Sequence, residues 1–456
     1  MAKTKDMRRW LLITAGVLIA VIIPQLLVES QFYARIISVA SVCLLLWLTE
    51  ATPPFVPSLV LWALVPLALG TLDERMRLPT VLVWAADPVL ALFFGGFALG
   101  VAAKRYGLDQ DLIEYALVIS GDSYKKLLLF VILITAFLSM WLSNIAAAAL
   151  MLACLRPAFN SLDESDLLRR VLLVGVALGA DLGGMATPIG TGPNAVAIAS
   201  LADTGPITFI GWMLFAFPLT IGMLFFSYFL LVWRIGGTDV QMATNIKFET
   251  TRRDRVDDPA FARGRSVLLG IMAGTICLWL SEPLHGISAA IISICASALL
   301  FLTRILDKDS LKRIDWSTLI LISGGITLGK LFETSGIILA FSRSVPFEAF
   351  DPTFGLFLVC MFTAVLASLM SNTASVIMLI PLATALIPSP STAILVAISA
   401  SFGIPFIIST PPNAMAFGEG GVRSSDLFWP GIIIMLLGCL IISTTGPAVL
   451  KLAGIA

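Results

Sequence analysis

Two polar motifs interrupt long apolar stretches of this chain. Ser371, Asn372 and Thr373 follow one another in "LMSNTASVIMLIPL", and Ser143 and Asn144 are adjacent in "WLSNIAAAALML". Hydroxyl and amide groups both donate and accept hydrogen bonds, so they bind a cation through their oxygens or an anion through their hydrogens. Two similar motifs in similar surroundings predict a pair of binding sites for small ions.

The composition indicates the surroundings of these motifs. Only 13% of the 456 residues are charged and 58% are hydrophobic, whereas a soluble domain carries about 25% charged residues. Several uncharged apolar runs reach about 18 residues, enough to cross a bilayer as a helix. They are continuous, unlike the short alternating segments of a membrane β-barrel. We predict an all-α polytopic membrane protein that contacts lipid and, lacking a basic patch, binds no nucleic acid.

The apolar runs predict about eleven transmembrane helices. Most of the 29 lysines and arginines fall on one side of the resulting topology, and the positive-inside rule makes that side the cytoplasm. We therefore expect a multi-pass protein of the inner (plasma) membrane with a cytoplasmic N-terminus. The first run follows four basic residues and has no cleavage site, which favours a span over a signal peptide. The expected spans are 11–28, 36–50, 55–71, 88–103, 168–187 continuing to 203, 207–233, 266–283, 286–303, 316–338, 391–408 continuing to 418, and 427–450.

Two further apolar stretches, 126–158 and 354–387, are each centred on a Ser-Asn pair. Each is long enough for two helices of about 15 residues, whereas a full span needs about 20. We therefore expect two re-entrant hairpins, each with its Ser-Asn pair at the tip.

The two halves of the chain repeat one another. The segment "GGFALGVAAKRYGL" from Gly95 resembles "GGITLGKLFETSGI" from Gly324, and "TPIGTGPNAVA" resembles "IISTPPNAMA", which aligns Asn194 with Asn413. An odd number of expected spans separates the copies, so the second copy is inverted in the membrane. Inverted repeats with helices broken near the midplane are typical of secondary transporters, and the breaks mark the binding site.

Glycine and proline break the helix in both copies of the second motif. Backbone without helical hydrogen bonds is tolerated near the middle of the membrane only where protein surrounds it or where it lines a water-filled cavity. Its free carbonyls suit a hard cation, and the half-helix N-termini after the breaks present free N–H groups and a positive dipole end to an anion. The alternative is that these polar residues only join helices, at about 0.6 kcal/mol per contact, but their repetition favours a site. The breaking residues are Gly183, Gly184, Pro188, Gly190, Gly192, Pro193, Pro405, Pro411 and Pro412.

These four motifs together resemble the divalent anion/sodium symporters, the sodium-dicarboxylate symporter family, over essentially the whole chain. The resemblance implies a homodimer, a scaffold domain that forms the dimer contact, and a transport domain that moves as an elevator. It implies scaffold parts at 1–122 and 265–350 and transport parts at 123–235 and 351–456, with a cytoplasmic linker at 236–264.

The resemblance also implies the site residues. One sodium site would comprise Ser139, Ser143, Asn144 and the Gly190 backbone, and the other Asn372 and the Ser409 backbone. The small organic anion would lie between Ser143, Asn144, Thr191, Ser371, Asn372, Thr373 and Pro411. Asp181, Asn194 and Asn413 are further candidates beside the breaks.

Two residues depart from the family pattern. Ile145 replaces the hydroxyl of the first Ser-Asn-Thr triplet, which suits a less polar or longer anion than a C4-dicarboxylate. Asp181 places a carboxylate within a span, where a charge costs about 2.5–3.5 kcal/mol. It would bind a cation, carry a proton, or pair with Lys330.

We predict a transporter that is not an enzyme and that carries di- or tricarboxylates such as succinate, malate or citrate together with Na⁺. One alternative is a sodium-independent dicarboxylate exchanger, or a sulfate-type anion transporter, with Lys330 as the fixed positive charge. Another is a cation/proton antiporter that uses Asp181. A hydrolase would need a catalytic dyad, which His285 and Asp181 do not form.

Overall fold

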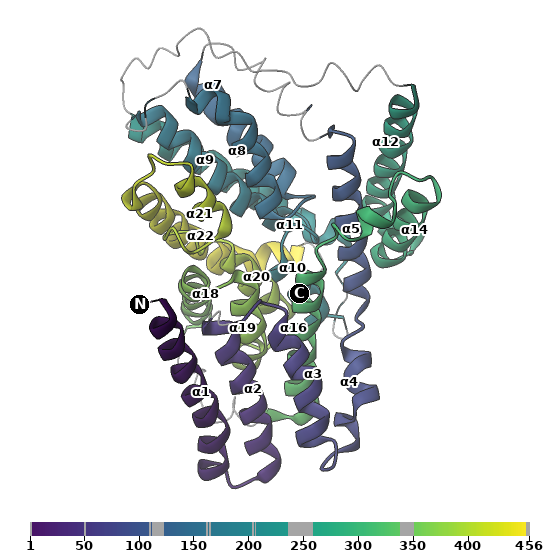
Figure 1. Ribbon diagram of the computed structural model, residues 1–456, viewed down its shortest axis with the longest axis vertical. Coiled ribbons are helices and arrows are strands. Elements are labelled where there is room, and N and C mark those ends of the chain that lie inside the picture. Colours follow the sequence, from purple (N-terminus) through teal and green to yellow (C-terminus); the bar gives the residue numbers. More distant parts are fainter. Residues whose placement is uncertain are drawn as a thin grey trace.

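The computed structural model describes residues 2–49, 52–108, 111, 123–160, 163, 166–202, 205, 207–235, 259–337 and 351–452. All regular elements of these segments are helices, which confirms the predicted all-α fold class (Figure 1). They are α1 (Ala2–Leu27), α2 (Gln31–Thr49), α3 (Val56–Leu69), η1 (Glu74–Met76), α4 (Leu78–Trp84), α5 (Pro88–Arg105), α7 (Tyr124–Ser139), α8 (Asn144–Asn160), α9 (Leu167–Gly183), η2 (Gly184–Ala186), α10 (Gly192–Ser200), α11 (Phe209–Ile235), α12 (Pro259–Leu280), α13 (Glu282–His285), α14 (Ala289–Leu302), α15 (Lys308–Leu311), α16 (Trp316–Ser335), α18 (Pro352–Leu369), α19 (Asn372–Leu386), α20 (Pro390–Ala400), α21 (Pro411–Gly418) and α22 (Ser424–Leu452).

Each predicted span coincides with a helix or a pair of helices. The stretches 168–203 and 391–418 are each divided into two helices by the glycines and prolines between them. Within the described segments, six helices are long and apolar enough to cross a membrane, namely α2, α5, α11, α12, α18 and α22. The count of eleven spans stays a prediction. The expected linker lies mostly outside the described residues, and α12 already begins at Pro259.

Both Ser-Asn pairs lie between two helices that pack against each other. Helices α7 and α8 are joined by a short turn that ends at Asn144, and α18 and α19 by a turn that ends at Asn372. Ser371 is the N-cap residue of α19. This arrangement of two packed helices around each Ser-Asn pair agrees with the expected hairpins. Figure 1 shows α7 and α8 side by side next to α9.

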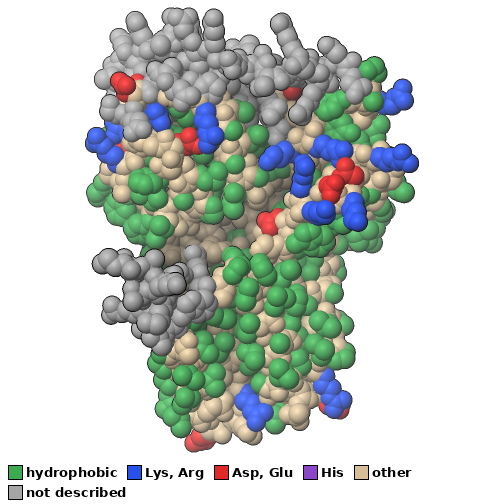
Figure 2. All heavy atoms as spheres, in the orientation of Figure 1, with side chains coloured by type: hydrophobic (Ala, Val, Ile, Leu, Met, Phe, Trp, Pro, Cys, Tyr) green, Lys and Arg blue, Asp and Glu red, His purple; other side chains and the backbone are tan. Residues whose placement is uncertain are grey.

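The surface has the polarity of a membrane protein. Figure 2 shows charged side chains gathered towards the two ends of the visible face, with an apolar band between them. Large apolar side chains on α12 and α14, such as Leu269, Leu278, Ile291 and Ile294, are between 45% and 54% exposed. Apolar area of this extent is stable in contact with lipid. The chain is a multi-pass membrane protein.

The two halves of the repeat interlock through glycines. Helix α5 packs against α14, and α16 packs against α3. A Cβ on Gly95 would lie 2.5 Å from Cβ of Ser293, and one on Gly324 would overlap Ser58. Small residues allow such close approach of membrane helices. The Gly-Gly pair of each repeat thus contacts a helix of the other repeat.

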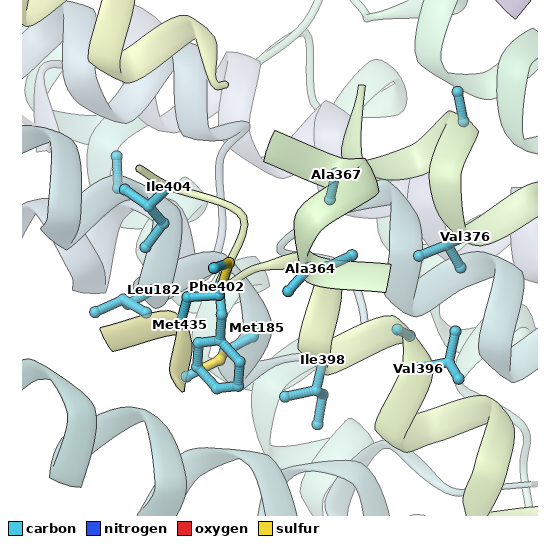
Figure 3. Packing of buried hydrophobic residues seen from close by; sticks show 14 of the residues in the cluster. Leu182, Met185, Ala364, Ala367, Val376, Val396, Ile398, Phe402, Ile404 and Met435 are labelled. Atoms are coloured by element: carbon cyan, nitrogen blue, oxygen red, sulfur yellow. The ribbon is translucent and has the colours of Figure 1, made fainter. Parts of the chain in front are cut away.

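The two broken segments lie close together in the protein interior. Figure 3 shows Leu182 at the end of α9 and Met185 of the first break beside Phe402 of the second break and Met435 of α22. All four are at most 5% exposed. Gly438 admits the Phe402 ring, since a Cβ there would lie 2.7 Å from a ring carbon. The first break is enclosed by protein over residues 184–190, whereas Phe406 and Ile408 of the second break are exposed.

Candidate ion and anion site

Three oxygens converge at the first hairpin tip. The Ser139 hydroxyl is 2.8 Å from Oδ1 of Asn144 and 2.7 Å from the carbonyl of Ala180, either of which it can donate to. A Cβ on Gly184 would lie 2.5 Å from Oδ1 of Asn144 and 3.2 Å from the Gly190 carbonyl oxygen. Ser139, Asn144 and Gly190, all expected as sodium ligands, are thus brought around one point of the first break.

Ser143 lies on the open side of this tip. Its hydroxyl accepts a hydrogen bond from the Ala146 N–H at 3.3 Å, so it caps the start of α8. The side chain also lines a cavity of about 650 Å³. Ile145, the departure from the family motif, is 49% exposed beside it.

The second tip presents an amide oxygen without a partner. Oδ1 of Asn372 is buried and accepts no hydrogen bond from the described residues. An unpaired buried acceptor costs about 1–3 kcal/mol, so it calls for a ligand. Ser409 ties the second break to this hairpin, because its hydroxyl donates to the Ser368 carbonyl at 2.9 Å. In the first repeat a hydroxyl also joins the hairpin to the broken segment, but from the hairpin side, since Ser139 of α7 can donate to the Ala180 carbonyl of α9.

Each hairpin packs against a half-helix of the other repeat. Helix α8 contacts α21, and α19 contacts α10. A Cβ on Gly192, at the start of α10, would overlap the Thr373 hydroxyl. The Thr410 hydroxyl, at the start of α21, donates to Oδ2 of Asp181 at 2.8 Å. This crosswise packing brings the two tips and the two breaks into one region.

Asn194 and Asn413 hold the breaks in shape. Nδ2 of Asn194 donates to the carbonyls of Gly184 at 3.1 Å and Thr187 at 2.8 Å. Nδ2 of Asn413 donates to the carbonyls of Ile404 at 2.7 Å and Phe406 at 2.9 Å, of which Phe406 corresponds to Thr187 in the repeat. Both amides are fully buried. Their geometry assigns them to the backbone of the breaks, although Oδ1 of each has no partner in the described structure.

Asn194→Ala is expected to destabilise the fold, because two buried carbonyls lose their donor, at about 1–3 kcal/mol each. Thermal unfolding of the detergent-solubilised protein measures this, and Asn413→Ala should lower the midpoint by a similar amount. Thr444→Ala is the control, since the exposed Thr444 hydroxyl bonds only within α22. A midpoint for Asn194→Ala equal to that of the control would contradict the assignment.

The half-helix N-termini offer fewer N–H donors than expected. Pro411 and Pro412 have none, and the Asn413 N–H is bonded to the Thr410 hydroxyl at 3.3 Å. At α10, Pro193 has no N–H and the Asn194 N–H is bonded to the Thr191 carbonyl. The expectation of free N–H groups is therefore wrong for the first turn of α21. Hydroxyls and side-chain amides remain as the anion's donors.

The predicted cation ligands differ in burial, since Ser143, Asn144 and Asn372, which are also predicted anion contacts, are partly buried. The hydroxyl-bearing residues Ser139 and Ser409 are buried. The residues expected at the anion are partly buried, and Pro411 is exposed. The partly buried set is Ser143, Asn144, Thr191, Ser371, Asn372 and Thr373.

Asp181 lies on α9 between the two repeats and is 1% exposed. Thr410 donates to one carboxylate oxygen, the Asn144 side chain also interacts with the group, and Oδ1 accepts no hydrogen bond from the described residues. The proposed pairing with Lys330 is wrong, because Lys330 forms an ion pair with Glu333 at 3.1 Å. The contact with Thr410 was not predicted, although Thr410 corresponds to Thr191 in the repeat.

An interlocked repeat with two broken helices and two polar hairpin tips defines a secondary transporter. Residues 44–391 match the family model described as "Citrate transporter" (CitMHS). The chain belongs to this family, and its recognition as a relative of the sodium-dicarboxylate symporters is confirmed.

Several proteins are similar to this chain. An "Uncharacterized transporter" of Haemophilus influenzae is 31% identical over 88% of both chains. The "Sodium-dependent dicarboxylate transporter SdcS" of Staphylococcus saprophyticus is 26% identical over 89% of this chain and 84% of its own. The "Inorganic phosphate transporter PHO87" of Saccharomyces cerevisiae is 29% identical over 76% of this chain, which spans only 38% of PHO87.

The fold also has a counterpart among solved structures. The YdaH transporter of Alcanivorax borkumensis superimposes with a TM-score of 0.60 at 15% identity, over 87% of this chain and 98% of that chain. At this identity the likeness concerns the fold. The family and its relatives make the protein a transporter and not an enzyme.

Proposed function

We propose that the protein carries a di- or tricarboxylate together with Na⁺ as co-transported cargo. The observation that supports this most directly is the pair of repeat-related amide oxygens. Oδ1 of Asn144 converges with the Gly190 carbonyl, and Oδ1 of Asn372 is buried without a partner. Neutral oxygens in this arrangement suit a hard monovalent cation, by the reasoning that holds for other hard cations.

The coupling follows from the charges of the tips. The residues proposed to contact the anion carry hydroxyl and amide groups, which supply no net positive charge. Na⁺ bound beside Asn144 and Asn372 supplies that charge and fixes both side chains, so the anion binds more tightly afterwards. By linkage, the anion raises the affinity for Na⁺ by the same factor.

The movement and assembly are proposed from the family resemblance. Transport parts 123–235 and 351–456 move as an elevator against scaffold parts 1–122 and 265–350, within a homodimer. The N-terminus and most basic loops lie in the cytoplasm, and the protein resides in the inner membrane. Supporting this, α5 and α16 carry glycines that face the transport parts, with Gly96 against Ile189 and Gly325 against Ile377.

Two alternative functions are retained. A sodium-independent anion exchanger, including one for sulfate or phosphate, agrees with the name of PHO87, but Lys330, the fixed charge expected for it, is neutralised by Glu333. A cation/proton antiporter is favoured by the buried Asp181 with its unpartnered oxygen. It would carry cations without any organic anion.

Uptake into proteoliposomes tests these functions. We expect radiolabelled succinate or citrate to accumulate only with an inward Na⁺ gradient. Uptake that is independent of Na⁺ but requires preloaded carboxylate would contradict symport and favour exchange. Na⁺ movement driven by a pH gradient without any carboxylate would favour the antiporter.

A further inference from the structure

The cavity beside the first hairpin tip has a basic wall. Its volume is about 650 Å³, and Ser143 lines it from the tip. Lys104 and Arg105 reach it from the last turn of α5, and Arg313 lines it from the segment just before α16. Figure 2 shows Lys and Arg side chains gathered beside a hollow on this face. Three cationic side chains therefore surround the approach to a predicted anion contact.

Two of these charges are not neutralised by neighbours. Arg105 is paired with Asp307 at 2.8 Å. In contrast, the exposed side chains of Lys104 and Arg313 have no carboxylate partner within the described segments. They therefore leave a positive potential in the cavity.

The two nearby carboxylates, Asp307 and Asp315, form hydrogen bonds with residues other than Lys104 and Arg313. The Ser310 N–H and hydroxyl, together with the Arg105 guanidinium, hold the pKa of Asp307 well below its usual range. Asp315 also lines the cavity, but it caps α16 by accepting from the N–H and hydroxyl of Thr318 at 3.0 and 2.6 Å. Neither carboxylate is directed at Lys104 or Arg313.

The corresponding cavity of the other repeat is nearly neutral. It has a volume of about 380 Å³ and is lined by Gly329, Lys330 and Glu333 of α16. These positions match Gly100, Val101 and Lys104 of α5 in the repeat. Lys330 and Glu333 form an ion pair at 3.1 Å. The matching residues of the first repeat are Val101 and Lys104, so this pair contains no acid. Only the first cavity therefore carries excess positive charge.

We propose that Lys104 and Arg313 form a collecting site for multivalent anions outside the Ser143 tip, on the cytoplasmic face. The proposal rests on the proposed function in taking the cargo to be an anion that binds at Ser143 and in placing this face in the cytoplasm. A di- or trianion entering the cavity is attracted by both charges and held near the tip. Such steering raises local anion concentration about tenfold or more and weakens as salt is added.

A first experiment measures the potential without using transport. Ala146 lines the cavity, so Ala146→Cys places a thiol there, and its labelling by anionic and cationic methanethiosulfonates is followed by mass spectrometry of its peptide. We expect the anionic-to-cationic rate ratio to fall about tenfold in the Lys104→Gln/Arg313→Gln protein. Lys312→Gln is the matched control, because Lys312 adjoins Arg313 but pairs with Asp309. An unchanged ratio in the double variant would overturn the proposal.

A second experiment measures the consequence for transport in the full-length protein. In inside-out vesicles, the apparent KM for citrate should be about tenfold higher in the double variant than in wild type. This KM should also depend much less on salt concentration than the wild-type KM does. Right-side-out vesicles should keep their KM, and the charge-conserving Lys104→Arg/Arg313→Lys variant should behave as wild type. Equal changes on both faces, or none, would overturn the proposal. Loss of Na⁺ dependence would instead contradict only the proposed symport.

Discussion

Asn144→Ala and Asn372→Ala are each expected to abolish carboxylate uptake at the Na⁺ concentrations that half-saturate the wild type, while the protein still folds. Each substitution removes an amide oxygen that is placed to bind Na⁺, one beside the Gly190 carbonyl and one buried without a partner. A bond to a charged group contributes about 1.5–3 kcal/mol, so the apparent Na⁺ affinity should fall about 10- to 100-fold. Uptake in proteoliposomes across a range of Na⁺ concentrations measures this effect.

The control for both variants is Thr444→Ala, which removes a polar group from α22 far along the chain from either tip. Thermal unfolding separates a lost site from a lost fold. Asn372→Ala should leave the midpoint unchanged or raise it, because an unpaired buried oxygen is removed. If both variants transport at the wild-type Na⁺ affinity, the paired tips are not the cation sites.

Gly190→Ala is expected to eliminate transport as well, by a different route. A Cβ at this position would overlap the Gly184 carbonyl oxygen and lie 2.9 Å from its carbon, so backbone would have to move. The movement displaces the oxygens around Asn144. Gly192→Ala meets only the end of the Thr373 side chain, which can rotate, and should chiefly raise the KM for the anion. Kinetics of uptake against both Na⁺ and carboxylate distinguish the two effects.

Gly222→Ala serves as the control for these glycine variants, because a Cβ on Gly222 meets nothing within 4 Å in α11. Alanine is the better helix former by about 1 kcal/mol, so this variant should be as active as wild type and at least as stable. A Gly190→Ala protein with normal Na⁺ dependence would show that the first break tolerates rearrangement and does not define a cation site.

Local features of the fold were predictable from the sequence because each depends on neighbouring residues. Glycines and prolines from 183 to 193 and from 405 to 412 interrupt the helix where they occur. The Ser-Asn pairs begin helices α8 and α19 because the lengths of the flanking apolar runs leave room for two short helices. The repeat also aligned Asn194 with Asn413, whose hydrogen bonds correspond closely.

Contacts between distant segments were not predictable in this way. Nothing in the order of residues indicates that α8 meets α21, or that Thr410 reaches Asp181. The assumption of free N–H donors at α21 overlooked two consecutive prolines and a threonine cap. Lys330 was considered for Asp181 because both are charged residues in apolar runs, yet Glu333 is one helical turn away from it.

The crosswise packing of hairpins on half-helices has a consequence for how such a chain can be divided. Hairpin α7–α8 contacts α21, hairpin α18–α19 contacts α10, and each Gly-Gly pair contacts the other half. A chain of half this length would lack the half-helix that packs against its hairpin, and it would lack half of the scaffold. It would have to associate with a second copy inserted in the opposite direction, so gene duplication and fusion would replace an antiparallel dimer by a single polypeptide.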